Sequence, residues 1–337
     1  MIYSKIIGTG GYLPPMVFTN ADWEKRVDTS DAWIVERTGI HSRHIASEAE
    51  TASSMAVNAA LSALAQAGIE AATLQMIIVA TGTPEFVFPA TACLVQKKLG
   101  ITTDCIAFDV QAACTGFIYA LSIADQYIKS GTIQRALIIG SELMSRLIDW
   151  SDRNTCVLFG DGAGAVILEA SNEPGILSTE LYSQGSFDEL LTIENMQMGD
   201  HTSTNPQLTQ VQNHNRPLDQ MYPFIKMQGQ KVFKIAVTKL GEMVQKSLQK
   251  HQLSVQDIDW FIPHQANIRI IKATADKLGI PMERVVCTVA THSNTSSASI
   301  PLALDVAVRE GRIQRGQRLL FEAFGGGLTW GSALVKY

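Results

Sequence analysis

An internal duplication constrains the fold of this chain more than any other feature of its sequence. The segment SGTIQRALIIGSE (Ser130–Glu142) resembles EGRIQRGQRLLFEA (Glu310–Ala323), and Gly131 of the first aligns with Gly311 of the second. The glycine-rich FGDGAGAVILE, from Phe159, parallels FGGGLTWGSALV, from Phe324. Upstream, two helix-like runs lead into LQMIIVATGT and IDWFIPHQA. Three resemblances in the same order predict that the chain consists of two similar halves.

Each half, residues 1–175 and 176–337, is predicted to alternate helices with short apolar strands. In the first half, CIAFDVQAA, RALIIGSE and GAVILEA are predicted strands, and Ala56–Gly68 and Gly116–Gly131 have helical spacing. Strands that alternate with helices need crossover connections and therefore form mostly parallel sheets. We predict an α/β protein with two halves packed about a pseudo-twofold axis. The polar segment 194–223 lacks apolar periodicity and is predicted to be a long surface loop.

The composition argues against several classes of protein. A net charge of -5, with both signs scattered along the chain, leaves no basic stripe for nucleic acid. The start, MIYSKIIGTGGYLPP, lacks the features of a signal peptide, and no apolar run reaches the roughly 18 residues of a membrane span. We therefore expect a cytoplasmic protein without membrane contact. The five cysteines form no C-x-x-C pair, so neither a disulfide framework nor a metal site is indicated.

Three polar residues follow predicted strands. Cys114, in DVQAACTGFIYA, stands where a predicted strand meets a predicted helix. The offset that relates Gly131 to Gly311 relates Cys114 to Asn294, in HSNTSSAS, so we expect these two residues at equivalent strand-to-helix junctions. His264, in IPHQAN, lies just beyond another predicted strand, where parallel sheets place their ligand sites. A pseudo-twofold axis would bring all three side chains toward the centre of the molecule.

A cysteine, a histidine and an asparagine so placed suit acyl chemistry. The positive end of a helix dipole would lower the pKa of the Cys114 thiol toward neutrality, and the thiolate could then attack a thioester. A neutral imidazole and an amide are donors that can hold a developing oxyanion. On residue types alone, a buried structural thiol, a structural histidine and a capping asparagine remain open alternatives.

Taken together, the motifs resemble those of one family. DVQAACTGFIYAL, IPHQAN, NTSSAS, FGDGAGA and EAFGGGLTWGSAL, in this order, are similar to β-ketoacyl-acyl-carrier-protein synthase III, the initiating condensing enzyme of bacterial fatty-acid synthesis. The resemblance covers almost the whole chain apart from residues 194–223. It implies a thiolase-like fold, which is a duplicated five-layer α/β/α/β/α sandwich with pseudo-twofold symmetry, and a homodimer.

The resemblance also implies a reaction. Cys114 would accept an acyl group from acyl-coenzyme A, and malonyl-acyl-carrier-protein would then lose carbon dioxide and attack the acyl-enzyme. His264 and Asn294 would donate hydrogen bonds to the malonyl thioester carbonyl. The backbone N–H groups of Cys114 and Gly326 would form the oxyanion hole for the acyl carbonyl. No metal or redox cofactor is implied, since coenzyme A and malonyl-acyl-carrier-protein act as substrates.

Further site residues are implied by the same resemblance. The coenzyme A and pantetheine site would consist of Thr29, Trp33, Arg37, Arg153, Phe233, Ala266 and Asn267. In it, Trp33 and Arg153 would lie on the two faces of adenine, and Arg37 would meet phosphate. Phe88 would cross the dimer interface and close the partner's acyl pocket, which favours a short primer such as acetyl.

Contacts with the acidic acyl carrier protein would come from Lys234, Arg269 and Lys277. Two positions depart from the family pattern. Asp276 stands where a basic residue is common, and Ser293 replaces a glycine that often precedes the asparagine.

Four alternative functions stay open from sequence. A relative on the same fold could use another acyl donor or acceptor in a specialised pathway. A degradative thiolase would need a second catalytic cysteine, and FGGGLTWG contains none. A cysteine hydrolase would use the histidine as a general base oriented by the asparagine. A silent module that binds carrier protein would not need the reactive residues.

Overall fold

The computed structural model describes residues 2–193 and 224–337, so the predicted surface loop at 194–223 lies outside the described residues. The first large sheet contains, in spatial order, β1 (Tyr3–Tyr12), β7 (Asp161–Ser171), β6 (Arg135–Leu143), β4 (Met76–Ala80) and β5 (Ile106–Val110). The second contains β11 (Trp260–Pro263), β12 (Arg318–Gly325), β13 (Thr329–Lys336) and β8 (Ile176–Ser183).

The two sheets share one pairing pattern. In the first, β4 is parallel to β5 and β6, whereas β7 is antiparallel to β6 and β1. In the second, β11 is parallel to β12, and β13 is antiparallel to β12 and β8. A single parallel bridge between Phe261 and Val285 stands where the first sheet has β5. The predicted duplication is therefore visible in the topology, while the boundary at 175/176 stays a prediction.

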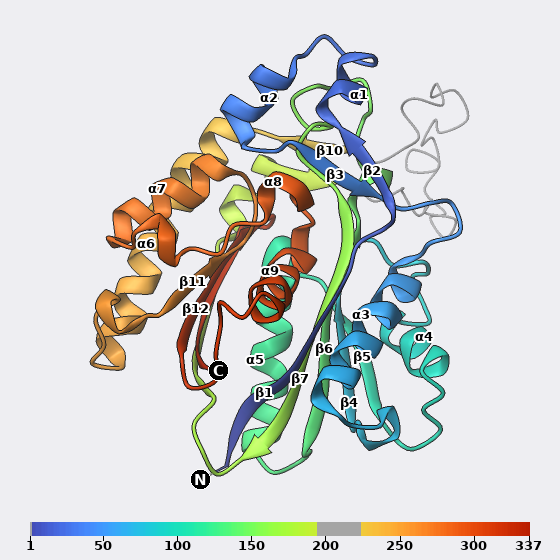
Figure 1. Ribbon diagram of the computed structural model, residues 1–337, viewed down its shortest axis with the longest axis vertical. Coiled ribbons are helices and arrows are strands. Elements are labelled where there is room, and N and C mark those ends of the chain that lie inside the picture. Colours follow the sequence, from blue (N-terminus) through green and yellow to red (C-terminus); the bar gives the residue numbers. More distant parts are fainter. Residues whose placement is uncertain (1, 194–223) are drawn as a thin grey trace, which may run out of the picture.

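Helices separate and cover the sheets in five layers (Figure 1). The helices of these layers are α3 (Ala52–Ala67), α4 (Thr91–Lys98), α5 (Gly116–Lys129), α9 (Ser299–Arg309), α6 (Gly229–Lys250) and α7 (Ile268–Leu278). Helices α3 and α4 cover the outer face of the first sheet, α5 and α9 lie between the sheets, and α6 and α7 cover the second. This arrangement confirms the predicted thiolase-like sandwich.

Alternation along the strands explains why both faces of the central sheets are covered. In β4, Met76, Ile78 and Ala80 join the core around α5 and α9. The intervening Ile77 and Val79 join the core beneath α3. Because side chains alternate between the faces of a strand, a continuous apolar run of this kind needs a helical layer on each side.

Smaller elements complete the fold. They are α1 (Asn20–Glu24), α2 (Asp31–Thr38), α8 (Val289–His292), β2 (Met16–Thr19), β3 (Ser42–Ile45), β9 (Leu191–Ile193) and β10 (Ile225–Met227). Strands β2 and β3 form an antiparallel pair, and α2 packs on α7. None of the helices described by the structure is long and apolar enough to cross a membrane.

The structure corrects the equivalence of Cys114 and Asn294 that the sequence repeat predicts. Helices α5 and α9 are followed by equivalent left-handed glycines, Gly131 and Gly311, which keep the offset of the repeat. The helix starts are further apart than this offset, because α9 is shorter, with 11 residues against 14. Each start follows a 3-10 turn whose first residue has positive φ: Ala113 at 46° and Ser296 at 49°. The equivalent of Cys114 is therefore Ser297, and Asn294 lies just before the turn.

Candidate active site

Cys114 lies at the centre of the turn Ala113–Thr115, between β5 and α5. The end of β12 packs directly against this turn. A Cβ on Gly325 would stand 2.8 Å from the backbone nitrogen of Cys114, so this approach requires glycine. Gly326 follows beside Ala113, where an added Cβ would be 3.7 Å from the alanine Cβ. The structure thus places the two predicted oxyanion-hole residues, Cys114 and Gly326, on adjoining segments.

One short segment, residues 294–299, connects the three predicted catalytic side chains. It contains Asn294, a hydrogen bond from its Ser296 side chain acts to lower the pKa of the Cys114 thiol, and its Ser299 hydroxyl lies 2.7 Å from Nδ1 of His264. Cys114, His264 and Asn294 are 8%, 6% and 7% exposed, so each is nearly removed from water. The predicted convergence of cysteine, histidine and asparagine is therefore supported by direct contacts.

The amide of Asn294 has a defined orientation. Its Oδ1 accepts a hydrogen bond of 2.9 Å from the backbone N–H of Ser296. Its backbone pairs with the 158–160 segment, donating to Leu158 O at 3.0 Å and accepting from Gly160 N at 3.1 Å. Because the amide oxygen is occupied by an N–H donor, the Nδ2 group remains as a donor for a substrate oxygen.

The imidazole of His264 is also held in one arrangement. Burial lowers its pKa to about 4, so the ring is neutral at physiological pH. The Ser299 oxygen accepts from the backbone N–H of Gln265 at 3.3 Å and shares a hydrogen bond of 2.7 Å with Nδ1 of His264, whose direction depends on the tautomer of the ring. When Ser299 donates to Nδ1, Nε2 of the neutral ring carries the proton and is a hydrogen-bond donor.

The predicted lowering of the Cys114 pKa is wrong. Burial is the largest influence and raises the pKa of the thiol to about 12, and the nearby Glu142 carboxylate adds to the rise. The Ser296 hydrogen bond and the backbone act in the opposite direction but are outweighed. Desolvation thus outweighs the effect of the N-terminal end of α5 on the pKa of the thiol, and the free enzyme holds a protonated thiol at neutral pH.

The predicted adenine site forms a cluster on α2 and the 149–155 segment. The guanidinium carbons of Arg37 and Arg153 lie 4.7 and 5.4 Å from the centre of the Trp33 ring. Arg153 is anchored by the backbone oxygen of Asp28 at 2.7 Å. The Thr29 hydroxyl is buried, and the described residues give it no hydrogen-bond partner. The structure thus brings together Thr29, Trp33, Arg37 and Arg153.

The predicted pantetheine and carrier-protein residues lie on α6 and α7. Asn267 caps α7 by accepting from Ile270 N at 2.9 Å, directly after Ala266. The Arg269 guanidinium lies 5.9 Å from the centre of the Phe233 ring.

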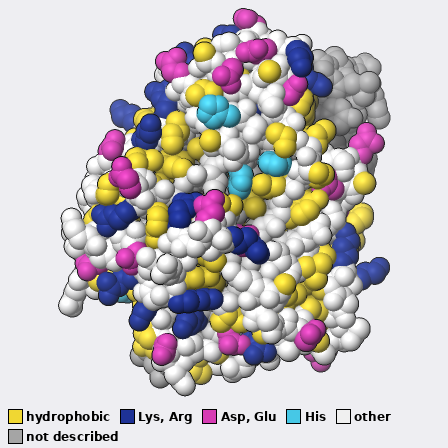
Figure 2. All heavy atoms as spheres, viewed as in Figure 1, with side chains coloured by type: hydrophobic (Ala, Val, Ile, Leu, Met, Phe, Trp, Pro, Cys, Tyr) yellow, Lys and Arg dark blue, Asp and Glu magenta, His cyan; other side chains and the backbone are white. Residues whose placement is uncertain are grey.

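The basic residues of this surface differ in their hydrogen bonding. Lys234 and Arg269 are exposed, whereas Lys277 donates to the backbone oxygens of Val237 and Thr238 on α6 at 3.2 and 3.3 Å. Figure 2 shows basic side chains interspersed with acidic ones over this side of the molecule.

Phe88 lies on the surface of the single chain, whereas the predicted catalytic side chains are buried. It is 84% exposed and adjoins Val87 at 85% and Phe86 at 55%. A contiguous exposed apolar run of this kind is typical of an interaction surface.

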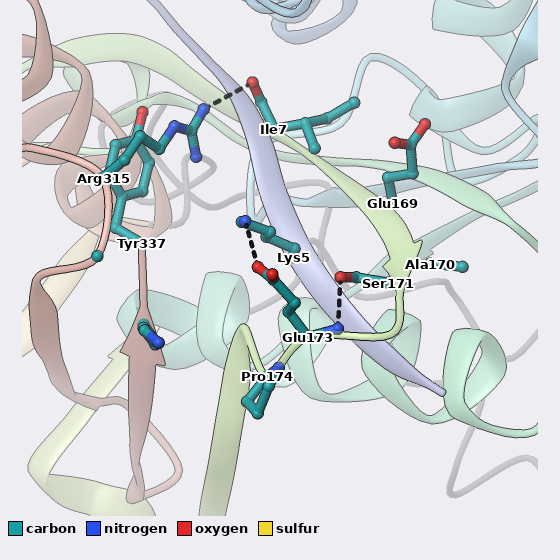
Figure 3. A pocket seen from close by; sticks show the side chains of 11 residues that line it. Lys5, Ile7, Glu169, Ala170, Ser171, Glu173, Pro174, Arg315 and Tyr337 are labelled. Atoms are coloured by element: carbon teal, nitrogen blue, oxygen red, sulfur yellow. Dashed lines mark hydrogen bonds and ion pairs between the residues drawn. The ribbon is translucent and has the colours of Figure 1, made fainter. Parts of the chain in front are cut away.

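A cavity of about 670 Å³ lies at the opposite end of the strands (Figure 3). Its lining includes Lys5 from β1, Glu173 after β7 and Arg315 before β12. Lys5 and Glu173 form an ion pair at 3.5 Å, and Arg315 donates to the backbone oxygen of Ile7 at 3.0 Å. Since the eight residues of β12 span about 25 Å, this cavity is separate from the turn that holds Cys114.

Sequence reasoning missed the residues that orient the catalytic side chains. Ser296 and Ser299 stand in the quoted HSNTSSAS motif, but nothing in their spacing indicated which neighbours they bond. Glu142 ends a predicted strand and is 1% exposed. The one sequence feature that could have indicated a role for Glu142 is an acidic residue at the carboxyl end of a predicted buried strand.

We expect acid to destabilise the fold through His264. Its pKa falls from 6.5 to about 4 on folding, so between these values the unfolded chain takes up a proton that the folded chain does not. The free energy of unfolding should therefore fall as the pH falls, by roughly 2 kcal/mol at pH 4.5. Urea unfolding at pH 7 and 4.5 should show a smaller loss in His264→Gln. An equal loss in both proteins would contradict this origin.

Comparisons with known proteins agree with the geometry. Residues 108–185 match the family model described as 3-oxoacyl-[acyl-carrier-protein (ACP)] synthase III, and residues 248–337 match its C-terminal counterpart. A β-ketoacyl-[acyl-carrier-protein] synthase III of Methylococcus capsulatus is 56% identical over 335 residues, or 99% of each chain. One from Thiobacillus denitrificans is 53% identical over the full length of both chains.

A solved structure shows the same likeness in three dimensions. The 3-oxoacyl-[acyl-carrier-protein] synthase III of Aquifex aeolicus is 47% identical and superposes with a TM-score of 0.90, over 99% of this chain and 100% of that one. Matches that extend over nearly the whole chain, together with the duplicated fold, confirm the resemblance found in the sequence. This chain belongs to the β-ketoacyl-acyl-carrier-protein synthase III family, the condensing acyltransferases that initiate fatty-acid synthesis.

Proposed function

We propose that Cys114, His264 and Asn294 catalyse the condensation of a short acyl group, acetyl first, from coenzyme A with malonyl-acyl-carrier-protein. The observation that carries the proposal is the 294–299 segment, which contains Asn294 and hydrogen-bonds both other side chains. Its bonds leave N–H donors on His264 and Asn294 and a thiol on Cys114. These are the groups that an acyl-enzyme and a decarboxylating thioester need.

In the first half-reaction, Cys114 sulfur attacks the thioester carbonyl and forms a new carbon–sulfur bond. The carbonyl oxygen becomes an oxyanion, which the N–H groups of Cys114 and Gly326 stabilise. Collapse of this intermediate breaks the bond to coenzyme A sulfur and leaves acyl-Cys114. The close approach of Gly325 to the Cys114 nitrogen supports this assignment, because it packs the end of β12 against the turn.

In the second half-reaction, malonyl-acyl-carrier-protein loses carbon dioxide. Negative charge moves onto the thioester oxygen, and Nε2–H of His264 and Nδ2–H of Asn294 stabilise it in a nearly dry site. The carbanion attacks the acyl carbon, and Cys114 leaves as a thiolate. The product is 3-ketoacyl-acyl-carrier-protein. None of these steps uses a metal or redox cofactor.

Substrate binding is assigned to the residues on α2, α6 and α7. Trp33 and Arg153 would receive the adenine ring between them, Arg37 would meet a phosphate, and Thr29 would offer its unpartnered hydroxyl. Phe233, Ala266 and Asn267 would line the pantetheine path.

Protein partners are assigned to two further surfaces. The exposed Lys234 and Arg269 would contact an acidic carrier protein, with Lys277 contributing less because its amine is bonded to α6. A second copy of the chain would cover the exposed Phe88, forming the homodimer. The cytoplasmic location stays a prediction.

The orientation of His264 argues against the hydrolase alternative. A cysteine hydrolase needs a ring nitrogen with a free lone pair toward the thiol. In the proposed mechanism Nδ1 accepts from Ser299, so Nε2 carries the proton and suits decarboxylation instead.

Acetyl-coenzyme A should add one acetyl group to the intact protein, on Cys114, and malonyl-acyl-carrier-protein should discharge it as acetoacetyl-acyl-carrier-protein. Mass spectrometry of intact protein and of product measures both steps. Cys114→Ala should not load. Loading by longer or aromatic acyl groups alone, or a loaded enzyme that ignores malonyl-acyl-carrier-protein, would favour a specialised relative.

Ser299→Ala should separate the two half-reactions. Without the Ser299 proton, Nδ1 of His264 loses the donor that fixes the tautomer, so condensation should slow by roughly 10- to 100-fold. Acylation of Cys114, which does not use Nε2–H, should change by less than about 3-fold. Single-turnover kinetics with acetyl-coenzyme A and then malonyl-acyl-carrier-protein resolve these rates. Equal slowing of both would refute the assigned role.

A pair of substitutions tests how Ser293 supports Asn294. Ser293 has φ of 56° and ψ of -160°, a region that favours glycine, and a Cβ on Gly160 would stand 2.3 Å from its hydroxyl oxygen. Gly160→Ala should therefore displace Asn294 and slow condensation at least 10-fold. Adding Ser293→Gly removes the clash and should restore most of the rate, leaving contacts of 3.1 and 3.2 Å. Failure of this rescue would show that the clash is not the cause.

A further inference from the structure

A buried carboxylate that the proposed reaction does not use lies beside the catalytic turn. Glu142, near the end of β6, is 1% exposed and has four hydrogen-bond partners. Its Oε2 accepts from Gly82 N at 3.0 Å and from the Thr83 hydroxyl at 3.1 Å. Its Oε1 lies 3.0 Å from the Ser296 hydroxyl and 2.8 Å from that of Ser297. A buried acid with this many partners is held in a fixed place.

The Ser296 hydroxyl connects this carboxylate to the thiol. It donates to Glu142 Oε1 at 3.0 Å, and its hydrogen bond with Cys114 acts to lower the pKa of the thiol. The turns that contain Cys114 and Ser296 pack against each other, and the Ser296 backbone is fixed by the bond from its N–H to Asn294 Oδ1. A hydroxyl has one proton and two lone pairs, so it can accept from the thiol while donating to the carboxylate. Cys114, Ser296 and Glu142 therefore form a continuous path for a proton.

The geometry also shows why the thiol needs such a path. Cys114 is protonated in the free enzyme and must lose its proton as sulfur bonds to the acyl carbon. In the tautomer of the proposed mechanism His264 does not take this proton, because Nδ1 accepts from Ser299 and Nε2 already carries a proton. Glu142 is the group whose charge acts directly on the Cys114 thiol.

We propose that Glu142 accepts the thiol proton of Cys114 through the Ser296 hydroxyl and holds it in the acyl-enzyme. This inference rests on the proposed role of Cys114. As the carbon–sulfur bond forms, the thiol proton moves to Ser296 oxygen and the Ser296 proton moves to Glu142 Oε1. Coenzyme A leaves as a thiolate and takes one proton from solvent. When condensation releases the Cys114 thiolate, the proton returns from Glu142 by the same path.

The environment of Glu142 suits both protonation states. Hydrogen bonds from Gly82 N and the Thr83 hydroxyl favour the ionised form of the carboxyl. Burial acts in the opposite direction and raises its pKa, which makes it a stronger proton acceptor than a surface glutamate.

The first test counts protons during acylation. In weak buffer with a pH indicator, wild-type enzyme should take up one proton from solvent for each Cys114 acylated by acetyl-coenzyme A. Direct transfer of the thiol proton to coenzyme A would give no net uptake and would overturn the proposal. The infrared difference spectrum between acylated and free enzyme should contain a protonated-carboxyl band that Glu142→Gln lacks. A band of equal intensity in Glu142→Gln would also overturn it.

The second test uses two neighbouring serines as a matched pair. Ser296 and Ser297 both bond Glu142 Oε1, but Ser296 is the one that also bonds Cys114. Ser296→Ala should slow acylation by on the order of 100-fold and abolish the proton uptake. Ser297→Ala should slow it by less than about 3-fold and keep the uptake. Equal rates in the two variants would refute the path.

These outcomes distinguish the inference from the function on which it rests. If the wild-type enzyme is not acylated on Cys114, the proposed function fails and the proton path fails with it. If Cys114 is acylated without proton uptake, the function stands and the path is wrong. Thermal unfolding of both serine variants checks that any difference in rate does not arise from a loss of folding.

Discussion

The structure depends on the packing of two 3-10 turns against each other between two sheets. The turns Ala113–Thr115 and Ser296–Ala298 lead into α5 and α9, the two helices of the central layer. Each turn also packs against a strand of the other half: the first against β12 and the second against β6. Glycines make this possible, since a Cβ on Gly140 would stand 2.3 Å from Ser297 O. The halves are thus joined through their catalytic turns.

Burial at this contact sets the protonation states of the site. Removal from water penalises charge, so it raises the pKa of the Cys114 thiol and lowers that of the His264 ring. The neutral histidine is what a donor to a developing oxyanion requires. The neutral cysteine is a poor nucleophile, and the same burial therefore creates the need for a proton acceptor nearby. In the proposed mechanism the dry centre favours decarboxylation, and acylation depends on Glu142 and Ser296.

The duplication, the strand-helix alternation and the placement of Cys114 and His264 beside strand ends could be predicted from sequence, because glycine-rich turns and apolar periodicity are local patterns. The raised pKa of Cys114 could not, since it depends on long-range packing of β12 and of residues 294–299 around the turn. Nor could the equivalence of Cys114 with Ser297, because the shorter α9 makes the offset at the helix starts larger than the offset at the helix ends. The bonding partners of Ser296 and Ser299 likewise depend on tertiary packing.

The two halves have diverged at equivalent positions in a way that the chemistry explains. The first half presents the proposed nucleophile, Cys114, at the centre of its turn, and the second presents Ser297, whose hydroxyl bonds Glu142 and Ala80 of the first half. The donor Asn294 lies before the turn, on backbone that pairs with Phe159. An asparagine in place of Ser296 or Ser297 would remove a partner of Glu142. Placing the donor outside the turn keeps the oxyanion function and the proton path on separate residues of one segment.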